Sequence, residues 1–189
     1  MTRQDALAEG VLACKSLLGT YLPGFDDSNR TRQAPNLPNH VAWTLGHCAL
    51  TMHRAAEKFV SRAGGAGGAA GAGALPDADF FRGSGTGGDP ERFDTETVAF
   101  GSTPADDPAR YPRFARCVEV FNGACDRLAA AVRGADDATL DRVVAWGARA
   151  ELPLFLLVQR MIFHTGNHTG QIADLRRALG LPPVLLARR

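Results

Sequence analysis

Hydrophobic residues recur at three- and four-residue spacing along four segments of the chain, and this spacing is typical of amphipathic helices. Proline or glycine follows three of these segments, at Pro23, Gly134 and Gly180, where helices commonly end. Asn39, a residue type that caps helices, stands at the start of the second segment. We therefore predict four long helices at about residues 3–21, 38–60, 112–132 and 152–180.

The connection between the second and third helices is long and changes character along its length. It begins with the run AGGAGGAAGAGA, which has too little side-chain volume to bury, and we expect a flexible insertion there. The remainder contains five aromatic residues and is expected to pack back onto the helices: Phe80, Phe81, Phe93, Phe100 and Tyr111. The prediction is a single all-α domain over residues 1–189, a four-helix bundle with a long Gly-rich crossover loop at 61–110.

The other two connections are shorter. Residues 25–39 are rich in Asp, Asn, Arg and Pro and show neither helical nor strand periodicity, so they are predicted to form a loop. Residues 136–152 fit either a short helix or a pair of strands around Val143–Trp146, and the pattern leaves both open.

Composition and charge exclude several classes of protein. Hydrophobic residues make up 45% of the chain and charged residues 22%, as in globular proteins. The formal net charge of +1 provides no field that would attract nucleic acid. No apolar run is long enough for a membrane span, and the N-terminus carries acidic residues where a signal peptide is basic. We expect a cytoplasmic protein with neither a nucleic-acid nor a membrane partner.

The cysteines do not spell out a known motif. They lie far apart and form no CxxC pair, which argues against a zinc knuckle and against a thioredoxin-type redox site. Free cysteine is among the residue types most often buried, so we expect small buried thiols at Cys14, Cys48, Cys117 and Cys125.

The candidate chemistry lies in the fourth predicted helix. His164 and His168 fall on the stripe that Leu and Met occupy elsewhere in this helix, so both are expected to face the interior. Histidines four residues apart project side by side, and their nitrogens can reach one cation. The alternative, hydrogen-bonded histidines without a metal, stays open for this pair alone. Gly166 and Gly170 beside them suggest a close neighbour or an access route.

A third ligand is expected from the second predicted helix. His40 and His47 share a face, whereas His53 is rotated about 120° from His47 and is expected on the solvated surface. His47 is preferred because it lies in mid-helix, whereas His40 adjoins the predicted cap. Cys48 projects about 100° away from His47 and is not expected to be a ligand.

Two stretches resemble the DinB-like, or YfiT-like, superfamily of metal-binding four-helix bundles. They are the run NHVAWTLGH at 39–47 and the run HTGNHTGQI at 164–172, which are similar to the "WxxGH" and "HxxxHxGQ" motifs of that family. The resemblance implies a three-histidine site for a divalent metal ion, often zinc or nickel, formed by His47, His164 and His168. Characterised relatives include bacillithiol transferases and a mycothiol-dependent maleylpyruvate isomerase, while many others have no known activity.

The expected function follows from this site. Three neutral imidazoles leave a divalent ion with its full charge and one open position, which activates a thiol or water for attack on a small electrophilic substrate. The partner would then be a small molecule such as a low-molecular-weight thiol, in an S-transferase or hydrolase reaction. The alternative is a non-catalytic bundle that binds a metal or a ligand, and the sequence does not decide whether the protein is an enzyme.

Other residues have candidate roles around the metal. Gln171 borders the histidine face and is the candidate catalytic residue, orienting bound water or a substrate group, although an amide that only packs helices is equally consistent. Thr165 and Asn167 are candidates for fixing the imidazole tautomers. A general base is either absent or supplied by the long loop, from Asp79, Asp94 or Glu96. Apolar residues on more than one helix face, including Val41, Ala42, Leu45 and Ala49, are consistent with a homodimer.

Overall fold

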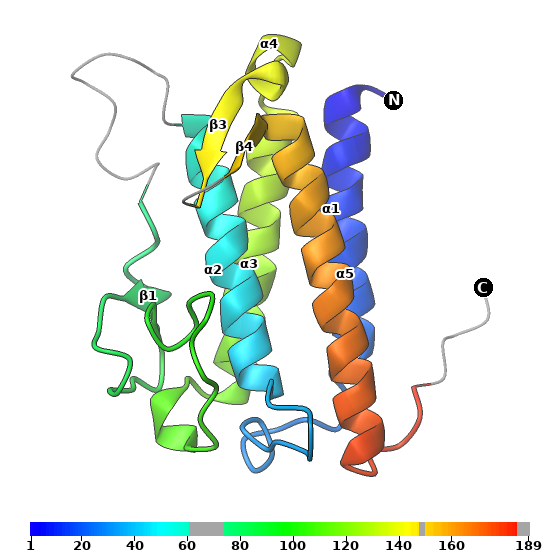
Figure 1. Ribbon diagram of the computed structural model, residues 1–189. Coiled ribbons are helices and arrows are strands. Elements are labelled where there is room, and N and C mark those ends of the chain that lie inside the picture. The colour runs from blue at the N-terminus through cyan, green and yellow to red at the C-terminus, as the bar shows by residue number, and fades with distance from the viewer. Residues whose placement is uncertain (61–73, 148–149, 185–189) are drawn as a thin grey trace.

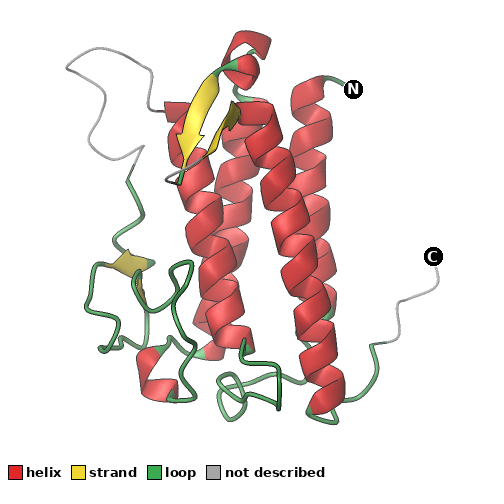
Figure 2. Ribbon diagram, viewed as in Figure 1, coloured by secondary structure: helices red, strands yellow, loops and turns green. Residues whose placement is uncertain are grey.

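Four long helices lie side by side in the computed structural model, which describes residues 1–60, 74–147 and 150–184 (Figure 1). They are α1 (Arg3–Thr20), α2 (Val41–Val60), α3 (Phe114–Arg133) and α5 (Leu154–Ala178). Both α2 and α1 pack against α3 and α5. The predicted all-α character is confirmed, with two small two-stranded sheets added to it (Figure 2). The glycine-rich run predicted as a flexible insertion lies outside the described residues.

Local sequence explains how the helices begin and end. Thr2 and Asp5 form a reciprocal capping box at the start of α1. Gly180 adopts a φ of 69° just after α5, and the amide of Leu181 reaches back to the carbonyl of Arg176. This is the left-handed glycine ending that the sequence predicted.

The cap of α2 differs from the prediction. His40, not Asn39, precedes the first helical residue, and its Nδ1 accepts the backbone N–H of Trp43 at 3.1 Å. Its Nε2–H donates to the carbonyl of Ala105 at 2.8 Å. An imidazole can cap here because a loop carbonyl fixes its tautomer, a long-range contact that the local sequence does not reveal. Asn39 is thereby free for another contact, described below.

The segment from Leu75 to Arg113 packs against the helices, as predicted. Three of the five aromatic residues on which that prediction rested lie in the core. Phe80, Phe93 and Tyr111 are buried. A short parallel pair, β1 (Phe80–Phe81) and β2 (Phe93–Asp94), holds the segment together, and a 3-10 turn at Pro108–Arg110 leads toward α3. Phe100 does not follow the prediction, because it is 95% exposed.

Residues 137–153 contain both of the structures that the sequence left open. A short helix, α4 (Asp137–Asp141), is followed by an antiparallel hairpin of β3 (Val143–Trp146) and β4 (Ala150–Pro153). The hairpin lies over the end where α2 finishes and α5 begins (Figure 1). Half-buried Val144, Trp146 and Leu152 pack it against the core.

Burial confirms the prediction for the cysteines and removes the argument given for a homodimer, which stays untested. All four cysteines are buried thiols, as expected. The apolar residues of α2 that were consistent with a homodimer are completely covered by the chain itself, so they offer no surface for a second copy: Val41, Ala42, Leu45 and Ala49. Within the described residues, no helix has the length and apolarity needed to cross a membrane.

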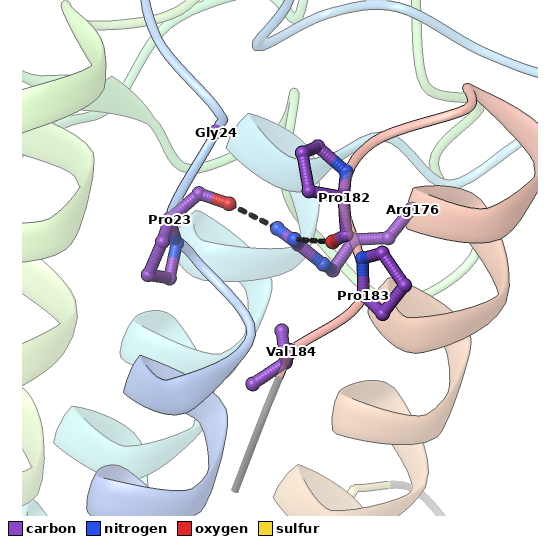
Figure 3. A pocket seen from close by; sticks show the side chains of 6 residues that line it. All are labelled: Pro23, Gly24, Arg176, Pro182, Pro183 and Val184. Atoms are coloured by element: carbon purple, nitrogen blue, oxygen red, sulfur yellow. Dashed lines mark hydrogen bonds between the residues drawn. The ribbon is translucent and has the colours of Figure 1, made fainter.

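Arg176 anchors the chain beyond α5. The buried guanidinium donates to the carbonyl of Tyr21. It also donates to the carbonyls of Pro23 and Pro182 (Figure 3). A small pocket opens beside it, lined by three prolines together with Gly24, Val184 and Arg176 itself. The guanidinium is already engaged there, so this pocket offers little for recognition of a polar ligand.

Burial of His40 predicts how stability depends on pH. Burial lowers its pKa to about 4, whereas the unfolded chain has the ordinary value of 6.5. Between these values the unfolded state binds more protons, so stability falls as pH decreases. From pH 7 to pH 5 this one group should cost about 2 kcal/mol. Urea unfolding with a chelator present should show that His40→Gln loses less stability over this range than the wild type. Equal losses would contradict the account.

Candidate metal centre

Three imidazoles converge between α2 and α5. The Nε2 atom of His164 lies 3.1 Å from Nε2 of His47 and 3.2 Å from Nε2 of His168. One nitrogen from each of the three rings falls within 4.8 Å of the others. The structure thus brings together the three residues predicted as metal ligands.

Hydrogen bonds at the far side of two rings fix which nitrogen carries the proton. His47 Nδ1–H donates to the carbonyl of Val98 at 2.8 Å, and His168 Nδ1–H donates to the amide oxygen of Gln171 at 2.9 Å. A neutral imidazole with its proton on Nδ1 presents a lone pair at Nε2. Both lone pairs point at His164, as in metal sites whose ligands have outer hydrogen-bond partners.

The cluster has too few N–H donors to give each of these lone pairs a hydrogen bond. If His164 carries its proton on Nε2, that proton can satisfy one of its two neighbours, and the other lone pair remains without a donor. His164 Nδ1 is itself buried without a hydrogen-bond partner. A divalent cation at the centre of the three nitrogens would satisfy all three lone pairs at once, so the residues present fit a metal ion.

Protonation is not an alternative way to satisfy the cluster near neutral pH. Burial, helped by the charges of the other two imidazoles and then of Arg160, lowers the pKa of His164 to about 3. Burial also lowers the pKa of His168 to about 4 and lowers that of His47. All three rings are therefore neutral at pH 7, which is the form that binds metals.

A turn at residues 97–102 of the long segment completes the wall around His47. Trp43 stacks on the His47 ring with centroids 4.6 Å apart and an angle of 8° between the rings. Its indole N–H donates to the hydroxyl of Ser102 at 2.9 Å. The same turn supplies the Val98 carbonyl to His47. The sequence had not indicated Val98 or Ser102, because a backbone carbonyl has no signature and the segment has no periodicity.

Gly46 permits this turn to approach α2. A Cβ at this position would lie 2.5 Å from a ring carbon of Phe93 and 2.8 Å from a methyl of Val98. A glycine in a helix interior costs nearly 1 kcal/mol relative to alanine. A glycine at this position, in mid-helix and next to His47, was therefore the sequence feature that could have indicated another segment packed close to His47.

Gln171 is the hydrogen-bond partner of the candidate metal ligand His168 in this structure. Its amide oxygen accepts the His168 proton and also the side-chain N–H of Asn39 at 3.1 Å. Through this contact Asn39, just before α2, is linked to the face of α5 that carries the histidines. The sequence had not indicated this role. Thr165 and Asn167, considered for fixing tautomers, do not do so: Thr165 is buried on another face, and Asn167 is exposed. The role of Gln171 toward a bound water stays a prediction.

The remaining histidine of α2 corrects a prediction. His53 was expected on the solvated surface, but it is only 2% exposed, because Phe80 of the long segment packs edge-on against it. Its Nδ1 accepts from Arg127 at 3.1 Å, and its Nε2 lies 3.7 Å from a carboxylate oxygen of Asp79. It does not belong to the three-histidine cluster. Cys48 is fully buried and, as predicted, is outside it too.

The carboxylates considered as general bases have other environments. Asp79 forms an ion pair with Arg116 at 2.6 Å. Asp94 is buried and accepts three backbone N–H groups, from Gly83, Gly85 and Glu96. Glu96 itself is exposed. Among the described residues, no carboxylate joins the histidine cluster.

The glycines of α5 have open space beside them. A Cβ on Gly166 or Gly170 would meet no atom within 4 Å beyond the local helix. The expectation of a close neighbour is therefore wrong for the described residues, and the access route stays a prediction.

Comparison with known proteins identifies the family. A family description named the DinB superfamily matches residues 15–172, which include both histidine-bearing helices. The chain belongs to the DinB superfamily. Searches of curated proteins and of solved structures found no match. Family membership and the buried His47, His164 and His168 cluster together support a metal-binding DinB protein, without identifying the metal.

Gly46→Ala should destabilise the protein and disturb the metal centre. The added methyl group overlaps Phe93 and Val98, and overpacking of this kind costs about 1–3 kcal/mol. Gly166→Ala is the matched control, because its methyl group meets open space and should be neutral or stabilising. Thermal unfolding and zinc titration would check both variants. Equal behaviour would mean that the 97–102 turn does not depend on Gly46.

Gln171→Ala should weaken metal binding while the fold is retained. The His168 ring loses the acceptor that holds its proton on Nδ1, and losses of this kind typically cost about 10- to 100-fold in metal affinity. Asn167→Ala, at an exposed position on the same helix, is the control. Competition with a chromophoric zinc chelator measures both affinities. Identical affinities would remove Gln171 from the support of the site.

Proposed function

We propose that this DinB-superfamily protein is a metal-dependent enzyme that activates a thiol or a water molecule for attack on a small electrophile. The reaction would be S-transfer or hydrolysis. The observation that carries the proposal is the donor set: three neutral imidazoles converge, and no carboxylate or thiolate of the described residues joins them.

A donor set of this composition suits a catalytic metal better than a structural one. Structural zinc sites are usually closed by four protein ligands, whereas catalytic sites have three and keep one position for a small molecule. A divalent ion bound by three neutral ligands keeps its full charge and lowers the pKa of a coordinated water to about 7, or favours a bound thiol as thiolate. We propose zinc or nickel as the ion, since imidazole suits both.

Residues of the chain would bind the ion, fix the tautomers of the ligand rings and exclude water. His47, His164 and His168 would hold the ion, while Val98 and Gln171 keep two of the rings in the tautomer that this requires. Trp43 stacks on His47 and keeps water from that side of the ring. None of these groups is placed as a general base, because the three imidazoles would serve as ligands, so the proton of the nucleophile would pass to solvent.

A comparison of wild type with a ligand variant tests the proposal. Tag-free protein loaded with zinc or nickel would be incubated with glutathione, mycothiol or bacillithiol and a panel of electrophiles. Loss of free thiol should be faster than with His47→Ala by more than about 100-fold, because even the loss of a ligand's supporting partner costs 10- to 100-fold. Asn167→Ala should match the wild type.

Hydrolytic substrates would be tested in the same way without thiol. If no combination of metal, thiol and substrate distinguishes wild type from His47→Ala, the catalytic proposal fails. A metal that binds tightly in that case would assign the site to a non-catalytic, metal-binding bundle.

A further inference from the structure

Two arginines lie beside the three-histidine site on its hairpin side. The chain runs upward through α2 and downward through α5, so the helices are antiparallel (Figure 1). Residues after His47 and residues before His164 therefore lie on the same side of the cluster, toward β3 and β4. Arg54 and Arg160 occupy these positions, and both are exposed.

Helix geometry places both arginines on the metal-facing sides of their helices. Arg160 precedes His164 by four residues, one turn or about 6 Å along the axis, with a rotation of about 40°. Arg54 follows His47 by seven residues, about 10 Å along the axis, with a rotation of only about 20°. Each guanidinium can therefore reach a molecule that extends from the histidines toward the hairpin.

Neither arginine is held in a close ion pair within the described residues. Within residues 1–60, 74–147 and 150–184, no ion pair or hydrogen bond involves the guanidinium of Arg54 or Arg160. The carboxylate of Glu57, one turn beyond Arg54, interacts with the charges of Arg54, Arg127 and Lys58. By contrast, Arg3, Arg116 and Arg133 each pair with a carboxylate elsewhere on the molecule.

Positive charge therefore remains in excess on this side of the site, because the carboxylate of Glu57 is shared among three cations. The three ligands are neutral, so an ion bound there contributes its full positive charge, and two guanidinium groups follow on the same side. A carboxylate suits this environment, because guanidinium groups bind carboxylates through paired N–H donors.

We propose that Arg54 and Arg160 bind a carboxylate of the thiol that reaches the metal centre, so that the cosubstrate of this protein is an acidic thiol. The spans of about 6 and 10 Å match a small molecule that has sulfur at one end and a carboxylate at the other. This inference rests on the proposed function, and within it the two arginines determine specificity and take no part in the chemical step.

Binding of two thiols that differ in charge tests the proposal. The probes are 3-mercaptopropionate and its neutral counterpart 3-mercapto-1-propanol, titrated into cobalt-loaded protein and followed by the thiolate-to-cobalt absorption band. The wild type should bind the acidic thiol more tightly than the neutral one. Arg160→Gln and Arg54→Gln should each reduce this preference by about threefold to fivefold, the range expected for one exposed ion pair.

Arg113→Gln is the matched control. Arg113 is also exposed, but it lies at the start of α3, so its removal changes the net charge equally without touching the proposed site. It should leave the preference unchanged, and circular dichroism with metal analysis would verify that each variant is folded and loaded. A preference reduced equally by Arg113→Gln would show a general charge effect and overturn the assignment.

The remaining outcomes separate this inference from the proposed function. If both thiols give the absorption band with equal affinity in the wild type, the open metal position stands and the acidic-thiol proposal fails. If neither thiol gives the band, the thiol-activating function fails and the inference fails with it.

Discussion

The site depends on one constraint. Three neutral imidazoles direct their Nε2 atoms at one point, where there are fewer N–H donors than lone pairs that need one. Carbonyl and amide oxygens hold the protons of His47 and His168 on the far side of each ring. Burial keeps the rings from acquiring additional protons, as the lowered pKa of each ring indicates. A bound cation would satisfy these lone pairs, and the contacts around the rings hold them in this orientation.

The long segment between α2 and α3 has a specific part in maintaining it. Its 97–102 turn provides the acceptor for His47 and is tied to Trp43 through Ser102. Gly46 allows the turn to come this close. The metal centre therefore depends on a segment outside the four long helices, and any change that lifts the turn should alter the orientation of His47.

Much of the fold and the ligand set could be predicted from the sequence, because both depend on short-range periodicity. His164 and His168 share a helix face by spacing alone, and His47 was selected by its position in mid-helix and by the family resemblance. The contacts made by residues 74–113 could not be predicted, because that segment has no period and acts through backbone carbonyls. For the same reason, the capping role of His40 and the burial of His53 were missed.

Every role proposed for this site depends on how the three histidines coordinate an ion. The most direct measurement is the zinc K-edge X-ray absorption spectrum of protein loaded with one zinc ion per chain. It should show three imidazole nitrogens at about 2.0–2.1 Å and one further light-atom ligand, and that ligand should give way to sulfur when a thiol is added. A sulfur ligand before any thiol is added, fewer than three imidazoles, or a fourth ligand that no thiol displaces would contradict these roles.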